Sequence, residues 1–383
     1  MEFIHTADWL IGHRFNGVEP SLRQQLEEGI WQALELLFIY ARKKRIPIIL
    51  CAGNAFSSSQ LADPKQLERL CDCTAQYPDI RLFIVPGAED ALTAGNIYSR
   101  VPQSRFPANL RVVTQNQKIP FLELNATVYA AVAESRQEDN NPLQWLEKEH
   151  PDPNAINVGL CHYGHYKDGA PALLSLDYLA CGGSAHYREI DSRCHYPGPP
   201  AQMDFGEPGF PLHVKISKPG AIPRVKKITG IAPFDWLAER IQLSDDSYSE
   251  IAAQLRHTSH RQIKKILVEG ELSIRNYIDY QDLLEHNRNG FYAIDDHVRV
   301  RPTDEDIDAL EDESARGLIQ ALVAWRTVEP SAGLEPGTVL KNKAGTFIMK
   351  QKSVADMADA IRDEDIIDRA MVSLYRQFGP SGQ

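Results

Sequence analysis

The fold of this chain is decided by the segment FIHTADWLIGH, residues 3–13, in which a short apolar run stops at polar and small residues. The same pattern returns in IPIILCAGNAF (46–56), LFIVPGAED (82–90) and LDYLACGGSAH (176–186). Each run has the length of a buried strand, and each ends in residues that favour turns. The four segments therefore predict strands that deliver polar side chains to one edge of a sheet, where α/β proteins collect their ligands.

Helix-like segments separate these strands. Apolar residues recur at helical spacing from Ser21 to Lys44, and a second helical segment covers Asp63 to Ala75. The resulting β-α-β-α-β order implies a largely parallel sheet with helical crossovers. More strands are expected near residues 112–114, 126–132, 157–161 and 212–216. We expect the first domain to cover residues 1–232.

The texture of the sequence changes after Pro233. A helix over 248–258, an alternating strand over 266–274, a helix over 280–288 and a hairpin over 290–301 predict a small α/β domain at residues 233–302. Residues 303–383 read as an acidic helix start, a linker, a hairpin that turns at Ala344-Gly345, and C-terminal helices. The whole chain is therefore expected to be α/β with a helical C-terminal region.

Composition narrows the class of protein. With 383 residues, 43% of them apolar and 24% charged, the chain predicts a globular protein of two or three domains. No apolar run reaches the roughly 18 residues of a membrane span, and the N-terminus lacks a signal peptide pattern, so we expect a cytoplasmic protein without a membrane partner. The six cysteines are expected to be reduced. A net charge of −11 argues against a surface that is basic throughout.

The turns after the strands resemble the motifs of the calcineurin-like metallophosphoesterases, and within them the SbcD-type DNA repair nuclease subunits. Five segments match the motifs in order: His5–Gly12, Gly53–Ser57, Pro86–Asp90, Val158–His162 and Ala180–Ala185. Tyr196–Pro199 and Asp204–Glu207 resemble segments specific to the SbcD type. The resemblance covers residues 1 to about 300. It implies a metallophosphoesterase β-sandwich flanked by helices, a small α/β capping domain, and a C-terminal helical region that docks on an SbcC-type ATPase.

Most metal ligands of that family are replaced here. Asp8 and His162 stand as the family has them. The other positions carry Leu10, Asn54, Ala88, Glu89, Gly183 and Ala185. Two divalent cations about 4 Å apart repel by about 16 kcal/mol at an effective dielectric constant of about 20. A bridging carboxylate offsets much of this repulsion, whereas the neutral amide of Asn54 does not. We therefore expect a non-catalytic SbcD-like subunit that needs no cofactor.

Two alternatives stay open. Asp8, Asn54, Glu89, His162 and His186 could together hold one Mn, Fe or Zn ion, with Glu89 as acid or base, in a remodelled phosphodiesterase or nuclease. The empty cleft could also bind a nucleotide or phosphate as a recognition module. Against the single-metal reading, these side chains can equally be polar remnants that line a solvated cleft.

Two basic segments are candidates for contacts with DNA. The DNA-binding candidates are Arg224, Lys226, Lys227, Arg261, Lys264 and Lys265. Positive side chains release counterions when they meet phosphates, which drives binding to nucleic acid. The alternative is an ordinary solvated face. A homodimer is also left open.

The C-terminal region carries two apolar stripes at helical spacing, separated by the polar residues 362–365. The stripes consist of Val354, Met357 and Ile361, then Ile367, Met371, Leu374 and Phe378. In view of the resemblance, these residues are candidates for binding an SbcC-type ATPase. They can also pack on the chain's own body, because amphipathicity does not name the surface that a helix covers.

Overall fold

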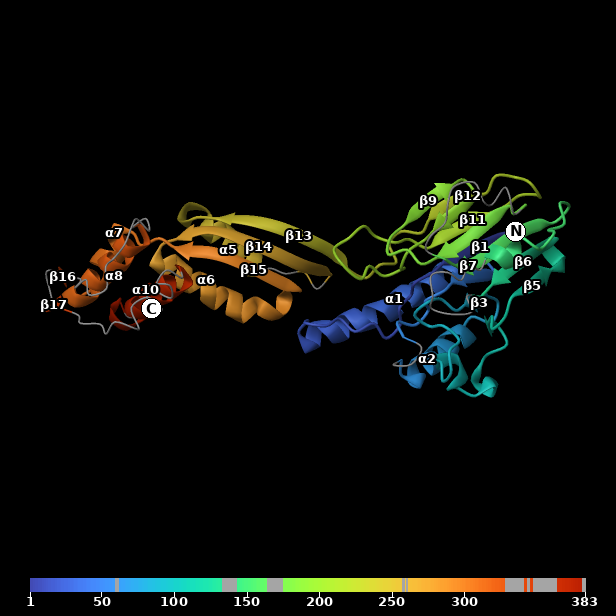
Figure 1. Cartoon of the computed structure of the whole chain (residues 1–383), viewed down its shortest axis with the longest axis horizontal. Helices are drawn as coiled ribbons and strands as arrows, with labels where there is room; N and C mark the ends of the chain where they lie inside the picture. The colour runs from blue at the N-terminus through green and yellow to red at the C-terminus, as the bar shows by residue number, and fades with distance from the viewer. Residues whose placement is uncertain are drawn as a thin grey trace. The chain divides into compact units, whose positions relative to one another are not determined.

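The computed structural model describes residues 1–58, 62–132, 143–163, 175–256, 259, 261–327, 341–342, 345–346 and 364–380. The chain forms two compact units (Figure 1). The first consists of Met1–Leu237 with Arg261–Ile263, and the second of Ala238–His260 with Lys264–Gln383. The fold is mixed α/β, with two six-stranded mixed sheets and a helical C-terminus. No helix in the described ranges is long and apolar enough to cross a membrane.

The first sheet contains the strands predicted from the opening segments. Its order is β12-β11-β1-β2-β3-β4. The strands are β1 (Glu2–Thr6), β2 (Ile48–Ala52), β3 (Arg81–Val85), β4 (Leu110–Val112), β11 (Leu212–Lys215) and β12 (Arg224–Lys227). Strands β1 to β4 are parallel, whereas β11 pairs antiparallel with β1, and β12 pairs antiparallel with β11. The parallel part needs helical crossovers, as the sequence predicts.

Helices α1 (Pro20–Lys44) and α2 (Pro64–Ala75) supply two of these crossovers. Each begins with proline, whose fixed φ suits the first helical turn and whose missing N–H is not needed there. Asp63 caps α2 by accepting a hydrogen bond from the Lys65 N–H at 3.0 Å. Arg45 ends α1 in a left-handed conformation, with three basic residues in the last turn, where positive charge complements the helix dipole. Both helices confirm the sequence prediction to within a residue.

The second sheet has the order β5-β6-β7-β8-β10-β9. Its strands are β5 (Gln117–Phe121), β6 (Ala126–Ala131), β7 (Ile156–His162), β8 (Tyr178–Gly182), β9 (Arg188–Asp191) and β10 (Cys194–Tyr196). Strands β6, β7, β8 and β10 are parallel, and β5 and β9 form antiparallel edges. Short helices lie in connections of both sheets: η1 (Ile97–Ser99) and η2 (Gln103–Arg105) between β3 and β4, η3 (Leu122–Leu124) between β5 and β6, and α3 (Leu143–Leu146) between β6 and β7.

The two sheets pack face to face through one shared apolar core. Phe3 of β1 and Ala7, directly after β1, pack in the same cluster as Tyr178 and Ala180 of β8, and all four are fully buried. His5 lies between Phe3 and Ala7 on the same face of β1, because alternate strand residues point the same way. Its ring bonds to the hydroxyl of Tyr178 at 3.0 Å and to a β8 carbonyl at 3.1 Å, so a polar link joins the sheets. This packing fixes both sheets at the edge where the strand-end turns meet.

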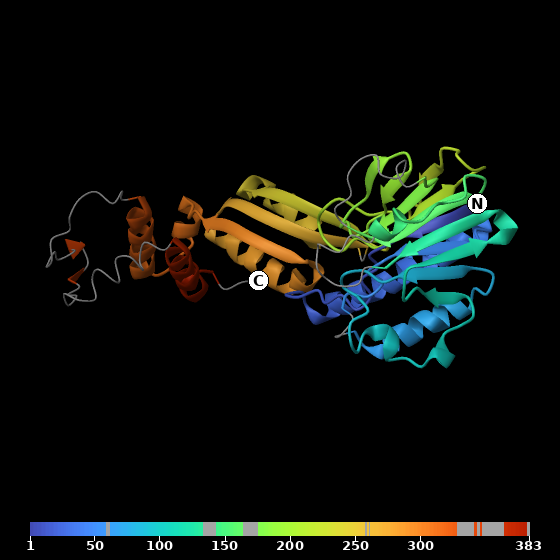
Figure 2. The same cartoon turned by 45° about the vertical axis from the view of Figure 1, so that its right-hand side comes forward.

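The second unit is built on the sheet β13-β14-β15 (Figures 1 and 2). The strands are β13 (Asp235–Leu243), β14 (Gln262–Leu272) and β15 (Ala293–Val300), and the helices are α5 (Asp245–Arg256), α6 (Ile274–Asn287) and the short η4 (Arg288–Gly290). Apolar residues of α5 and α6 share one core with all three strands. The expected hairpin over 290–301 is wrong: β15 is a single strand that pairs parallel with β14. Helix α6 makes the crossover, starting at Ile274 behind the N-cap Ser273.

The C-terminal part comprises α7 (Asp304–Asp308), α8 (Glu313–Thr327), a short antiparallel pair of β16 (Lys341–Asn342) with β17 (Gly345–Thr346), and α10 (Glu364–Phe378). Ile367 and Met371 of α10 are buried in a cluster with residues of α6, α8 and β15, while Leu374 and Phe378 pack at its margin. For this stripe the structure favours packing on the chain's own body. The stripe of Val354, Met357 and Ile361 lies outside the described residues.

Candidate functional site

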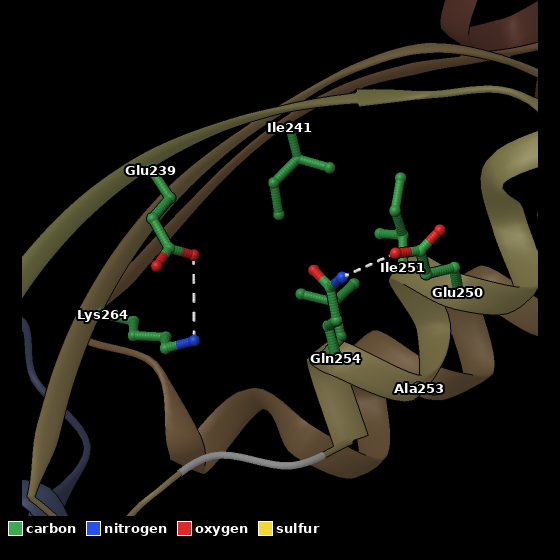
Figure 3. Close-up of a pocket in the computed structure, with 8 residues that line it drawn as sticks. Glu239, Ile241, Glu250, Ile251, Ala253, Gln254 and Lys264 are labelled. Carbon is green, nitrogen blue, oxygen red and sulfur yellow. Dashed lines mark hydrogen bonds and ion pairs between the residues drawn. The ribbon is translucent and has the colours of Figure 1, made fainter.

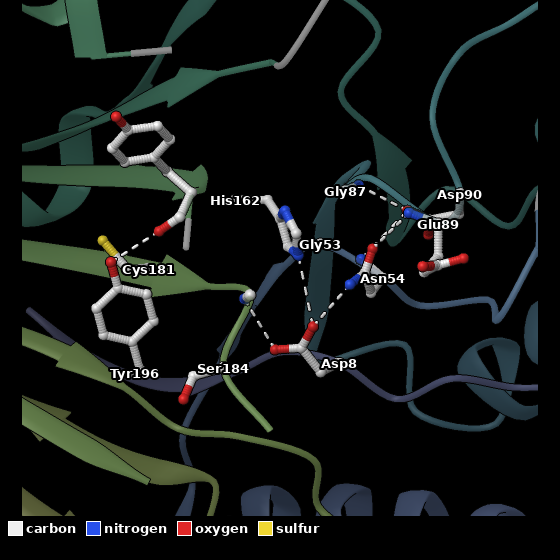
Figure 4. Close-up of polar contacts among 12 residues, drawn as sticks. Asp8, Gly53, Asn54, Gly87, Glu89, Asp90, His162, Cys181, Ser184 and Tyr196 are labelled. Atoms are coloured by element: carbon white, nitrogen blue, oxygen red, sulfur yellow. Dashed lines mark hydrogen bonds and ion pairs between the residues drawn. The ribbon is translucent and has the colours of Figure 1, made fainter. Parts of the chain in front are cut away.

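The strand-end turns of both sheets meet at one point (Figure 4). Asp8 follows β1 and Asn54 follows β2 by two residues each, and Glu89 lies in the turn after β3. From the second sheet, His162 is the last residue of β7 and Gly183 comes directly after β8. The structure thus brings together the positions that the sequence places at one sheet edge.

Asp8 lies at the centre of this cluster and is 5% exposed. Its Oδ1 accepts a hydrogen bond from Asn54 Nδ2 at 2.9 Å, and its Oδ2 accepts one from the Gly183 N–H at 3.0 Å. His162 Nε2 lies 3.4 Å from the same Oδ1. The carboxylate therefore links three turns from both sheets. Hydrogen bonds to an ionised acceptor are among the stronger ones in proteins.

The orientation of the Asn54 amide is determined by its two partners. Its Nδ2 donates to Asp8, which can only accept when ionised, and its Oδ1 accepts from the Glu89 N–H at 2.9 Å, which can only donate. The reversed amide would place donor against donor and acceptor against acceptor. Asn54 is 8% exposed, so both groups need these partners. Asn54 therefore joins the turns after β1 and β3, by donating to Asp8 and accepting from the Glu89 N–H.

Asp90 holds the same turns from the inside. It is fully buried and accepts hydrogen bonds from the N–H groups of Asn54 (3.1 Å), Gly87 (2.6 Å) and Phe56 (3.3 Å), and from the hydroxyl of Tyr98 (2.5 Å). Burial raises the pKa of this carboxyl, and the hydrogen bonds act against that rise. Asp90 is thus a structural anchor for the turns after β2 and β3. Tyr98 was missed by the sequence analysis, because nothing local marks it as the partner of a carboxylate eight residues earlier.

The backbone of the cluster is strained at several neighbouring residues. Asp8, Leu10 and Asn54 have φ of 53°, 51° and 51°. Asp and Asn tolerate this left-handed region, whereas for leucine it costs about 1–2 kcal/mol. Gly53 has φ of 92°, and a Cβ there would lie 2.4 Å from His162 Cδ2. Such strain tends to cluster at functional sites.

His162 is the least satisfied member of the cluster. Its side chain is 9% exposed, and its Nε2 has no hydrogen-bond partner within the described part of the chain. The 3.4 Å contact with Asp8 joins the two atoms without hydrogen-bond geometry. A buried imidazole nitrogen and a carboxylate are both ordinary metal ligands, but two ligands alone do not fix an ion.

The residues present do not fit a dinuclear metal centre. Over the ranges that the structure describes, no three His, Cys, Asp or Glu side chains converge as a metal site would require. The Asn54 NH₂ group points at Asp8, where a metal would need an electron-pair donor. His186, the other candidate ligand, bonds through its backbone to the Ser184 hydroxyl, with its carbonyl accepting at 2.7 Å. Glu89 reaches Asn54 through its backbone N–H, and its carboxylate is exposed.

His13 lies close enough to the strand-end turns for the charge of Glu89 to act on it. Its ring packs edge-on against Phe15, with the ring centroids 4.8 Å apart. Burial lowers the pKa of His13, while the carboxylates of Glu27 and Glu89 act in the opposite direction. His13 is therefore predominantly neutral at pH 7.

The first group of DNA-binding candidates lies on β12, at the edge of the first sheet. Arg224 and Lys226 are exposed on one face of that strand. Lys227 points to the other face, and its Nζ lies 3.7 Å from the ring centroid of Tyr187 and 5.0 Å from that of Phe210. Lys227 is thus engaged with aromatic rings, which leaves Arg224 and Lys226 as the outward cations of this group.

The second group is divided between the two units. Arg261 belongs to the first unit, and Lys264 and Lys265 belong to the second. As neighbours on β14, Lys264 and Lys265 point to opposite faces of the sheet. Lys264 Nζ lies 3.8 Å from a carboxylate oxygen of Glu239, and its side chain is only 15% exposed. Lys264 and Lys265 therefore do not form one basic face.

All six cysteines are buried free thiols. Cys161, Cys181 and Cys194 lie on adjacent strands, with sulfur separations of 3.9 and 4.0 Å along the row.

No protein-family model matches the sequence, and neither does any curated protein.

Proposed function

We propose that this chain is a non-catalytic, SbcD-like subunit with a metallophosphoesterase fold, which acts as a structural partner of an SbcC-type ATPase in a DNA-processing complex. The observation that carries the proposal is the Asn54 side chain, which donates to Asp8 and accepts from the Glu89 N–H. A hydrogen-bonded amide holds the turns that two metal ions and a bridging carboxylate hold in the family that the sequence resembles.

Two further observations support this reading. First, the backbone is left-handed at Asp8, Leu10 and Asn54, although Leu10 brings no polar group to the strand-end turns. Such strain persists only where the surrounding structure holds it, which is consistent with a metallophosphoesterase-type scaffold around these turns. Second, the turns that resemble the family's motifs follow strands of both sheets and meet at one cluster. Turns that resemble the family's motifs but carry altered chemistry favour a partner over a nuclease.

The proposal is tested by co-expressing the full chain with a tagged SbcC-type ATPase. We expect the chain to co-purify with the ATPase and the complex to show no Mn²⁺-dependent cleavage of linear duplex DNA beyond that of the ATPase alone. Failure to co-purify removes the partner assignment. Cleavage that Asp8→Ala abolishes removes the non-catalytic assignment.

The second candidate is a phosphodiesterase or nuclease with one metal ion. It is favoured by His162 Nε2, a buried nitrogen without a hydrogen-bond partner in the described residues, 3.4 Å from Asp8 Oδ1. Under this alternative, Asp8 and His162 would be the protein ligands and Glu89 the acid or base. Hydrolysis of a chromogenic phosphodiester, lost in both His162→Ala and Glu89→Gln, would favour it. Calorimetric titration with nucleotides and single-stranded DNA separates the third alternative, a phosphate-binding module.

A further inference from the structure

The second unit contains a groove between strand β13 and helix α5, here called the β13/α5 groove (Figure 3). It encloses about 520 Å³. Its walls come from the face of β13 and β14 on one side and from α5 on the other. The lining residues are Glu239, Ile241, Glu250, Ile251, Ala253, Gln254, Leu255 and Lys264.

The groove is an apolar surface that the core leaves partly uncovered. Ile241 and Ile251 pack at the margin of the cluster formed by the sheet, α5 and α6, and neither is fully buried. Leu255 lies within that cluster and also lines the groove. Covering apolar surface contributes about 25 cal/mol per Å². The groove is therefore suited to receive an apolar side chain.

The charges at the rim select what accompanies that side chain. Glu239 and Lys264 form a long ion pair of 3.8 Å, while Glu250 accepts a hydrogen bond from Gln254 at 3.4 Å. Glu239 remains 42% exposed, whereas Lys264 is largely buried. Two carboxylates against one ammonium leave an excess of negative charge at the opening. This excess favours a basic group on the ligand.

The backbone beside the groove is also available. Strand β13 is an edge strand, with β14 on one side and, in the part of the chain that the structure describes, no strand on the other. Its nine residues are mostly exposed or half-buried. An edge of this length presents N–H and C=O groups that pair readily with another strand. An edge strand facing a helix, with a pocket between them, is the arrangement that peptide-binding domains use for strand addition.

We propose that the β13/α5 groove binds an extended segment of a partner protein, which adds to β13 as an outer strand. Glu239 and Ile241 are two residues apart, so they face the same side of the sheet about 7 Å apart. An added strand presents its alternate residues to that side. The segment therefore carries an apolar residue opposite Ile241 and, two positions away, a lysine or arginine opposite Glu239. This inference does not depend on the proposed function of the strand-end site.

The test uses the full chain and a set of capped peptides as long as β13, in which threonine fills the positions that are not varied. One peptide carries lysine and leucine two positions apart, and a second carries the same residues side by side. A third repeats the first sequence with alternate backbone amides methylated. Binding is measured by fluorescence anisotropy. We expect saturable binding of the first peptide and binding at least about tenfold weaker for the other two. The second peptide cannot present its lysine and leucine on the same face of the added strand, and the third lacks the backbone N–H groups that would pair with β13.

Variants of the exposed lining residues locate the binding. Glu239→Lys and Ala253→Arg are each expected to weaken binding about tenfold, the first by charge reversal and the second by filling the groove. Gln242→Lys is the matched control, because Gln242 lies on the opposite face of β13 and should leave binding unchanged. Circular dichroism verifies that each variant is folded.

Several outcomes would overturn the inference. These are no saturable binding of the first peptide, equal binding of all three peptides, or equal effects of Glu239→Lys and Gln242→Lys. Sedimentation of the peptide-free chain adds one more outcome. A dimer that Glu239→Lys dissociates would assign the groove to a second copy of the chain.

Discussion

Replacement of Asn54 by aspartate is the most informative single change at the strand-end cluster. In the structure, Asn54 Nδ2 lies 2.9 Å from Asp8 Oδ1. In Asn54→Asp an acceptor takes the place of that donor, so two carboxylates come into contact. With charge centres about 4 Å apart and an effective dielectric constant of about 20, the repulsion is about 4 kcal/mol. One of the pair can instead take up a proton, which also costs about 4 kcal/mol at pH 7 for a group with a pKa near 4.

We therefore expect Asn54→Asp to lower the free energy of unfolding by about 4 kcal/mol at pH 7, measured by urea denaturation. The deficit should shrink towards pH 5, where protonation is easier, and should shrink further when Mn²⁺ is added, because a cation offsets the paired charges. A metal present at about 100 times its Kd contributes about 2.7 kcal/mol. Stability of Asn54→Asp equal to wild type without metal would refute the reasoning, since it would mean that the two side chains are not in contact.

Asn54→Ala separates charge from hydrogen bonding. It removes both side-chain hydrogen bonds without adding a carboxylate, so we expect a loss of about 2 kcal/mol. Added Mn²⁺ should not restore this variant. Recovery of both variants by Mn²⁺ would show that the metal acts elsewhere on the chain.

Three further predictions concern the scaffold. Burial lowers the pKa of His5 to about 3, so between pH 6.5 and pH 3 the unfolded chain binds a proton that the folded chain excludes, and stability falls with pH. His5→Gln should reduce this fall by about 1.4 kcal/mol per pH unit. An unchanged difference between the free energies of unfolding at pH 6 and pH 4.5, measured by urea denaturation, would contradict this. Gly182→Ala would place a Cβ 1.7 Å from the Ala52 carbonyl oxygen and should destabilise the first unit by about 3 kcal/mol in thermal unfolding. Gly317→Ala is the contrasting change: a Cβ there meets open space on α8, so it should stabilise the second unit by about 0.5–1 kcal/mol. Asp368 is 3% exposed and pairs with arginines of α8 and β15. Asp368→Ala should lower the free energy of unfolding by about 3 kcal/mol and increase amide hydrogen exchange across α10. Unchanged exchange in α10 would show that the ion pair does not hold the helix.

The strands and crossover helices of the first unit could be predicted because their signals are local. Apolar runs, turn residues and helical spacing specify β1 to β3 and the helices between them. The pairing of β15 could not be predicted in this way. Its alternating pattern indicates a strand, but its partner β14 lies on the far side of α6 in the chain, whereas the sequence predicts a local hairpin over 290–301. Strand identity is written locally, whereas strand pairing depends on the packing of the whole core.

At the candidate site, the sequence predicted which turns carry polar residues, and the structure added how they interact. The spacing of motifs does not show that Asn54 donates to Asp8, nor that Tyr98 satisfies Asp90. The bond from His5 to Tyr178 joins residues 173 positions apart, and no local pattern announces it. The C-terminal apolar stripes show the same limit of local sequence patterns.

An apolar stripe predicts that a helix is covered, without naming what covers it. In the structure, residues of α6, α8 and β15 cover Ile367 and Met371, so these two reach a partner only if α10 moves.

The number of metal ions that the strand-end cluster binds separates a non-catalytic chain from a metal-dependent enzyme most directly. Calorimetric titration of the purified full chain with Mn²⁺, together with metal analysis of the protein, measures this number. We predict no stoichiometric binding to the wild-type chain, and a new site in Asn54→Asp that is lost when Asp8→Ala is combined with it. One or two Mn²⁺ ions bound per wild-type chain, and lost in both Asp8→Ala and His162→Ala, would contradict the account.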